Sequence, residues 1–248
     1  MIRTIYCVVC LVASMIFFTP FGLVGLLLSP FGLKKPMSYL MRFCAWSWGH
    51  FMLAVLGCRM TVSGRENVPR KGGICFVSNH EGYIDILVLL AYAGRPFGFV
   101  AKKELMFAPI LNIWIPMLGG QFIDRKNLRK AFKTINTGVA RIKSGGAMII
   151  FPEGHRSRGR GLLPFHPGSF KLATQSETVI VPVAISGTYH IFEKRHLITP
   201  GPVSITFCKP INTADIPAAD RKTILSDQVY EVIKQTLEEG DLHAKREN

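Results

Sequence analysis

Residues 74–92 read ICFVSNHEGYIDILVLLAY. The apolar run from Ile74 to Ser78 follows a pair of glycines and predicts a short buried β-strand. From Asp85 to Tyr92 the apolar side chains recur with helical spacing. A polar segment separates the two. A strand, a polar turn and a helix in this order are the unit from which α/β folds are built.

The same alternation continues along the chain from residue 59 onward. Helices are predicted at 108–118, with Pro109 in the first turn, at 128–142 and near 219–239. Pro182 lies inside an apolar strand and indicates an edge strand or a bulge, because proline lacks a backbone N–H. The remaining strands are expected at 60–63, 97–101, 121–123, 147–151, 178–185 and 203–207. The pattern therefore predicts an α/β fold.

The N-terminal part of the chain is apolar and carries no charge from residue 4 to residue 33. A helix that spans a bilayer needs about 20 apolar residues, so this stretch is long enough. One interpretation is a single span followed by an interfacial turn. Another is two short helices, near 4–18 and 21–29, that dip into one leaflet, because Pro20 interrupts the run. A cleaved signal peptide is a third, disfavoured because no small-x-small cleavage site follows convincingly.

A second apolar run, from residue 43 to residue 58, contains Trp46 and Trp48 and is read as an interfacial helix or a buried one. We therefore divide the chain into an N-terminal membrane-associated helical region, 1–58, and a catalytic domain, 59–248. Lys34, Lys35 and Arg42 follow the first apolar run. By the positive-inside rule they place the downstream domain on the cytoplasmic side of the cytoplasmic membrane.

The chain is basic, with 30 Lys and Arg against 16 Asp and Glu and a net charge of +14. No acidic residue precedes Glu66, so the basic part is also the apolar part. This combination favours an anionic membrane surface over nucleic acid as a partner, and no nucleic-acid-binding motif is present. The six cysteines are scattered, and Cys7 and Cys10 have no second pair, so we expect reduced thiols and no metal site.

His80 and Asp85 are candidates for acid–base chemistry. On one continuous helix, residues five apart are turned about 140° from each other, so the two meet only if His80 lies in the turn before the helix. Asp85 would then accept a hydrogen bond from one imidazole nitrogen and leave the other nitrogen free as a base. The alternative is a loop in which Asp85 merely caps the helix.

Other strand ends also carry polar groups. Residues 151–158 read FPEGHRSR and open a long, basic, Gly-rich loop that reaches residue 167. Residues 119–125 read GGQFIDR, and residues 101–105 read AKKEL. Arginine suits bidentate binding of phosphate. Together these groups favour a pocket for an anionic substrate.

Over residues 60–210 the sequence resembles the glycerolipid acyltransferase family, whose type member is 1-acyl-sn-glycerol-3-phosphate acyltransferase. Four blocks match in the family's order: Asn79, His80 and Asp85 of His-x4-Asp; the Phe-Ile-Asp-Arg block through Arg125; Phe-Pro-Glu-Gly at 151–154; and Val-Pro-Val at 181–183. The resemblance implies a mixed, mostly parallel sheet flanked by helices, with an N-terminal apolar membrane-anchoring helical segment.

The resemblance also implies roles. His80 would be the general base and Asp85 its orienting partner, whereas the acceptor-binding residues would be Lys103, Arg125, Glu153, Gly154, Arg156 and Ser157. The expected reaction moves a fatty acyl group from acyl-CoA or acyl carrier protein to the sn-2 hydroxyl of lysophosphatidic acid, with no cofactor beyond that co-substrate. The partners would be the lysophospholipid, the acyl donor and the bilayer.

The sequence departs from the family's pattern at Glu81, Gly82 and His155. Glu81 is expected to point outward; if it faced the phosphate site, another acceptor such as a lyso-ornithine lipid would be favoured. A hydrolase that uses the same histidine and a non-catalytic membrane lipid-binding protein are further alternatives.

Overall fold

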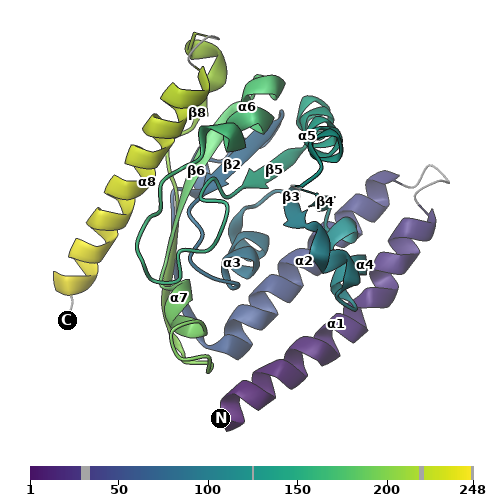
Figure 1. The fold of residues 1–248 in the computed structure, drawn as a ribbon. Coiled ribbons are helices and arrows are strands. Elements are labelled where there is room, and N and C mark those ends of the chain that lie inside the picture. The colour runs from purple at the N-terminus through teal and green to yellow at the C-terminus, as the bar shows by residue number, and fades with distance from the viewer. Residues whose placement is uncertain (29–33, 125, 218–220, 247–248) are drawn as a thin grey trace.

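The computed structural model describes residues 1–28, 34–124, 126–217 and 221–246. Its centre is a mixed, mostly parallel sheet of eight strands in the order β1-β7-β6-β2-β5-β3-β4, with β8 paired to β6 (Figure 1). The strands are β1 (Cys58–Ser63), β2 (Ile74–Ser78), β3 (Phe97–Lys102), β4 (Gln121–Ile123), β5 (Ala147–Ile150), β6 (Val179–Ser186), β7 (Gly201–Phe207) and β8 (Ile211–Asn212). The predicted α/β class is confirmed.

Five strands, β6, β2, β5, β3 and β4, are parallel neighbours, so their carboxyl ends share one edge of the sheet. β7 runs antiparallel to β6 and parallel to β1. β2 lies between β5 and β6 with all five of its residues buried. The turn that follows β2 therefore opens from the middle of the sheet, which is where ligands bind in open α/β folds.

Helices cover both faces of the sheet. The helices are α1 (Ile2–Leu28), α2 (Lys34–Leu56), α3 (Asp85–Tyr92), α4 (Leu111–Met117), α5 (Leu128–Lys143), α6 (Lys171–Ser176), α7 (Thr188–Ile191) and α8 (Arg221–Arg246). Alternate residues of β2 point to opposite faces, as the pleat of a strand requires. Ile74 and Phe76 pack in a core with residues of α2 and α3, whereas Cys75 and Val77 pack in a second core with residues of α6 and α8.

The N-terminal segment is one continuous helix, α1, that passes through Pro20 and lies alongside α2 in the opposite direction (Figure 1). The expectation of two short helices near 4–18 and 21–29 is therefore wrong. The Trp48 indole Nε1 donates to Ser14 Oγ at 3.0 Å, and Trp48 and Met52 belong to the same core as Ile74. Residues 2–21 are long and apolar enough to cross a membrane, and most of this stretch is not buried in the protein.

The helix start expected at Pro109 and the edge strand expected at Pro182 are both wrong. Pro109 does not begin a helix, because α4 starts at Leu111 and Ile110 has a φ of 69°. Pro182 lies in a central strand and not at an edge, and opposite it the pairing register shifts by one residue, so that residues 181–182 face the three residues 208–210. Its carbonyl accepts from Cys208 N at 2.9 Å, so the missing N–H also faces that side. On that side the partner changes from β8, at Ile180, to β7, at Val183, so the ladder to β2 loses no hydrogen bond.

Candidate active site

His80 and Asp85 meet at the carboxyl end of β2, as the sequence predicts. His80 lies in the turn and Asp85 is the first residue of α3, fully buried. The imidazole Nδ1 lies 2.6 Å from Asp85 Oδ2. The ring stacks on Phe151, with centroids 4.1 Å apart. With Nδ1–H donating to the carboxylate, Nε2 is left with the lone pair of a base.

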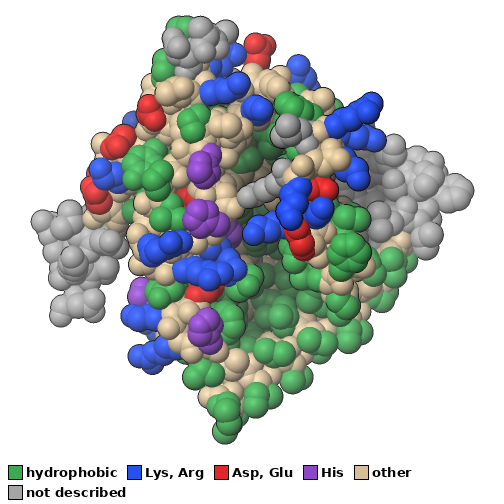
Figure 2. Space-filling view, viewed as in Figure 1, with side chains coloured by type: hydrophobic (Ala, Val, Ile, Leu, Met, Phe, Trp, Pro, Cys, Tyr) green, Lys and Arg blue, Asp and Glu red, His purple; other side chains and the backbone are tan. Residues whose placement is uncertain are grey.

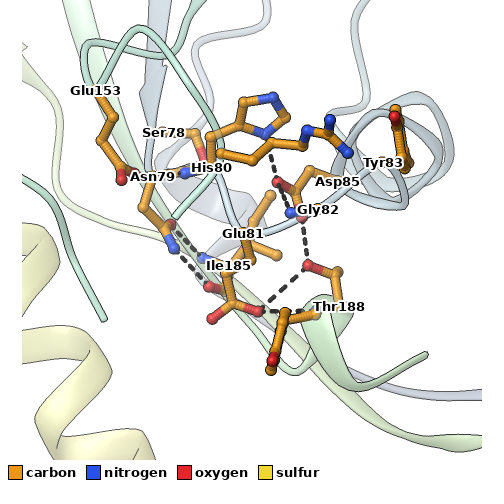
Figure 3. Close-up of polar contacts among 12 residues, drawn as sticks. Ser78, Asn79, His80, Glu81, Gly82, Tyr83, Asp85, Glu153, Ile185 and Thr188 are labelled. Carbon is orange, nitrogen blue, oxygen red and sulfur yellow. Dashed lines mark hydrogen bonds and ion pairs between the residues drawn. The ribbon is translucent and has the colours of Figure 1, made fainter. Parts of the chain in front are cut away.

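Asp85 receives two further hydrogen bonds. Gly82 N donates to Oδ2 at 3.0 Å, and the hydroxyl of Thr188, at the start of α7, donates to Oδ1 (Figure 3). Thr188 is fully buried. Sequence reasoning missed Thr188; the only signal was its place just after the Val-Pro-Val strand.

The Asn79 side chain fixes the beginning of the turn. Its amide nitrogen donates to Ile185 O and its oxygen accepts from Ile185 N, both at 2.8 Å (Figure 3). This pair of bonds continues the pairing with β6 beyond Ser78, the last residue of β2. It therefore ties the His80 turn to the segment that carries Thr188.

Glu153 and Ser157, from the loop after β5, hold the main chain of His80. Glu153 is buried, and its Oε1 accepts from His80 N at 2.6 Å, while Oε2 accepts from Leu163 N at 3.2 Å. Ser157 N donates to His80 O at 2.7 Å. Burial raises the pKa of Glu153 to about 7. Gly154, with a φ of 72°, makes the bend between Glu153 and Ser157 in a conformation that glycine adopts without strain.

Arg156 folds over the same turn. Its guanidinium carbon lies 3.6 Å from the centre of the Tyr83 ring, and Nη1 lies 3.4 Å from Glu193 Oε1. Glu193 Oε1 also accepts from Tyr83 N at 2.6 Å. These contacts make Arg156 part of the wall of the site. Sequence reasoning missed Glu193, which belongs to no matched block.

Glu81 does not point outward, contrary to the expectation. Its Oε2 lies 3.3 Å from both Thr188 Oγ1 and Tyr189 N, on the side of the turn away from the His80 ring (Figure 3). Burial and then the Asp85 charge raise the pKa of Glu81 to about 7. Glu81 is therefore an internal carboxyl that supports the turn.

The Lys103 ammonium, just after β3, is paired with Asp124 Oδ2 at 2.8 Å, just after β4. This pairing lowers the pKa of Asp124. Arg125 lies outside the described residues. Because β3 and β4 belong to the parallel part of the sheet, Lys103 and Asp124 lie at the same sheet edge as His80.

On the surface around the carboxyl ends of the parallel strands, a basic region lies next to an apolar one. Figure 2 shows Lys, Arg and His side chains beside a hollow, with hydrophobic side chains below it. Large exposed apolar residues occur on α1, on α2 and just after β3, where Phe107 is 84% exposed. Within the part of the chain that the structure describes, no group of three or more His, Cys, Asp or Glu could hold a metal ion.

The chain is similar to known proteins. A family model described as Acyltransferase matches residues 59–186. The chain is 33% identical to the 1-acyl-sn-glycerol-3-phosphate acyltransferase of Saccharomyces cerevisiae, over 77% of this chain and 63% of that protein. It is 32% identical to the enzyme of that name from Borreliella burgdorferi, over 60% of each chain. The matches thus span less than two thirds of these relatives.

A solved structure is similar over nearly the whole length. The crystal structure of the 1-acyl-sn-glycerophosphate acyltransferase PlsC from Thermotoga maritima aligns with a TM-score of 0.84 and 27% identity. The alignment covers 97% of this chain and 95% of that one. The similarity therefore includes the N-terminal helices as well as the sheet.

Gly82 offers a test of how tightly the turn is packed. A Cβ at Gly82 would lie 2.7–2.9 Å from the Glu193 carboxylate, which is itself buried and bonded to Tyr83 N. We expect Gly82→Ala to displace Glu193 and to lower the melting temperature by several degrees, in line with the roughly 1–3 kcal/mol that overpacking costs. Differential scanning fluorimetry in detergent would measure it.

The matched control is Gly168→Ala, because a Cβ at Gly168 meets nothing within 4 Å. A Gly82→Ala protein that melts at the temperature of the Gly168→Ala protein would show that the turn tolerates the extra methyl group.

Proposed function

Since this chain belongs to the acyltransferase family, we propose that it transfers a fatty acyl group from acyl-CoA or acyl carrier protein to the sn-2 hydroxyl of lysophosphatidic acid, giving phosphatidic acid. The observation that carries the proposal is the 2.6 Å contact between His80 Nδ1 and Asp85 Oδ2 at the parallel edge of the sheet. The names and activities of the similar proteins support the choice of substrate.

The reaction follows from the protonation state of the imidazole. Nε2 removes the proton of the acceptor hydroxyl, and the hydroxyl oxygen forms a bond to the thioester carbonyl carbon of the donor. Asp85 stabilises the imidazolium that results. When the tetrahedral intermediate collapses, the carbon–sulfur bond breaks and the imidazolium returns its proton to the leaving thiolate. No acyl-enzyme is required, so no serine or cysteine nucleophile is invoked.

The acceptor phosphate is assigned to the basic groups that follow β3 and β4. Arg125, which follows Asp124 in the sequence, is the proposed ligand, because a guanidinium forms bidentate bonds to phosphate, and Lys103 is proposed to assist it. Lys103 is paired with Asp124, so it contributes by exchanging that partner for the phosphate. Glu153, Gly154, Arg156 and Ser157 act mainly by shaping the wall around His80.

The position of Glu81 removes the main reason to consider a lyso-ornithine lipid as the acceptor. That reason rested on a carboxylate of Glu81 near the phosphate site, and Glu81 instead contacts Thr188 and Tyr189 inside the turn. A non-catalytic lipid-binding protein would need no oriented base. The His80–Asp85 contact therefore favours an enzyme over a lipid-binding protein, and the position of Glu81 favours a phosphate-bearing acceptor over the lyso-ornithine lipid.

The first test removes the base. We expect His80→Ala to lower acyl transfer to lysophosphatidic acid by at least 100-fold, because general base catalysis contributes about 10²–10⁴-fold. Transfer of a radiolabelled acyl group measures it, with His166→Ala, an exposed histidine outside the site, as the control. More than a tenth of wild-type activity in His80→Ala would refute the assigned role.

The second test addresses the phosphate. Arg125→Ala should raise the KM for lysophosphatidic acid by about 10-fold or more, the effect of losing a charge-assisted pair. Hydrolysis of acyl-CoA in the absence of acceptor should change little. Arg129→Ala, which removes an exposed arginine of α5, is the control. Equal losses in transfer and hydrolysis would argue against phosphate recognition by Arg125.

We further propose that the enzyme works at the cytoplasmic face of a membrane, held there by α1. The support is the exposed apolar surface of α1, the apolar residues after β3, and the basic residues beside them. Anionic headgroups attract basic residues next to an apolar anchor.

Cysteine labelling can test on which side of the membrane the domain with the proposed active site lies. Lys143→Cys places a thiol on the exposed end of α5. A membrane-impermeant maleimide should label this variant in inverted bacterial membrane vesicles and not in intact cells, with the wild-type chain as the background. Labelling in intact cells would contradict the cytoplasmic orientation.

A further inference from the structure

Thr188 lies behind the proposed catalytic pair, on the side away from the His80 ring (Figure 3). It follows β6 through Gly187, whose φ of 94° turns the chain into α7. Its side chain is fully buried, and its hydroxyl contacts Asp85 Oδ1. Gly187 has no room for a side chain, because a Cβ there would lie 2.4 Å from Pro202 O. The turn that delivers Thr188 is thus fixed by the backbone.

The two oxygens of Asp85 have different partners. Oδ2 accepts from His80 Nδ1 and from Gly82 N, whereas among the described residues the hydrogen-bond donor to Oδ1 is Thr188. A carboxylate held through one oxygen can rotate about its Cβ–Cγ bond. Thr188 holds the other oxygen and so fixes the plane of the carboxylate. Because the plane is fixed, Oδ2 keeps pointing at the imidazole.

We propose that Thr188 is a positioning residue for the acyl transfer: its hydroxyl fixes the Asp85 carboxylate so that Oδ2 keeps His80 in the Nδ1–H tautomer with Nε2 free for the acceptor hydroxyl. This inference rests on the proposed function. It adds a residue from the end of β6 to a pair that comes from the end of β2 and the start of α3.

Glu81 is a second acceptor near the same hydroxyl. Thr188 Oγ1 lies 3.3 Å from Glu81 Oε2, farther than from Asp85 Oδ1, and a hydroxyl has one proton to donate. The Tyr189 N–H also points at Glu81 Oε2, at 3.3 Å, and satisfies that oxygen independently. The proton of Thr188 is therefore left for Asp85. Because burial and the Asp85 charge favour the neutral form of Glu81, its competition for that proton is weakened further.

Two substitutions separate the hydroxyl from the shape of the side chain. Thr188→Val keeps the branched shape and removes the donor, whereas Thr188→Ser keeps the donor and removes a methyl group. We expect Thr188→Val to lower kcat by about 10- to 100-fold with KM for lysophosphatidic acid within about 3-fold, and Thr188→Ser to retain kcat within about 3-fold. The control is Thr213→Val, because Thr213 is also fully buried and its hydroxyl has no partner within the described residues.

Three kinetic outcomes overturn the proposal. The first is more than half of the wild-type kcat in Thr188→Val, and the second is an equal loss in Thr188→Ser and Thr188→Val. The third is a Thr188→Val effect that appears in KM alone. Circular dichroism melts of the variants check that each is folded at the assay temperature.

A second measurement needs no substrate. Nitrogen-15 NMR of histidine-labelled full-length protein in detergent micelles reports the tautomer of each neutral imidazole, and His80→Ala identifies the His80 signals. We expect the Nδ1–H tautomer in the wild type and a mixture of tautomers in Thr188→Val. The same tautomer in both proteins would overturn the role of Thr188, even if His80→Ala confirms the enzyme. Conversely, a tautomer change in a protein that does not acylate lysophosphatidic acid would leave this role standing and refute the proposed acceptor.

Discussion

The hydrogen bond between His80 Nδ1 and Asp85 Oδ2 is the interaction on which the rest of the site depends. It decides which nitrogen carries the proton, and therefore where a base is available. Around it the protein places main-chain and side-chain groups that leave the pair little freedom: Glu153 and Ser157 hold the backbone of His80, while Gly82 and Thr188 hold the carboxylate. The residues around His80 thus serve mainly to orient the His80 ring and the Asp85 carboxylate.

This arrangement is possible because β2, β5 and β6 are parallel neighbours. Their carboxyl ends bring together residues from three distant parts of the sequence. Pro182 fits into the central strand of this group because its missing N–H faces the place where β8 gives way to β7. The sheet also brings Lys103 and Asp124 to the same edge, next to the apolar surface after β3.

The helix pair α1–α2 belongs to the same core as the sheet face that it covers. Trp48 and Met52 pack with Ile74 and Phe76, and the outward side of α1 is apolar. An anchor packed in this way would hold the active site at a defined height above the lipid headgroups. Under the proposed function, in which the acceptor and the product are membrane lipids, the acceptor would not have to be extracted into water.

The local pattern of the sequence determined the α/β class and the limits of β2, α3 and β4, because the strand–turn–helix spacing is set by residues close in the chain. It allowed His80 to meet Asp85, and the structure shows that the two do meet. The two-helix interpretation at Pro20 and the edge-strand interpretation at Pro182 failed because packing against α2 and the pairing of β6 on both of its sides outweigh a local proline signal. Thr188, Glu193 and the inward turn of Glu81 could not be predicted, because each depends on contacts between residues about a hundred positions apart. Spacing and the family resemblance therefore singled out His80 and Asp85 as a candidate pair, and only the tertiary fold decided which groups hold the two side chains in place.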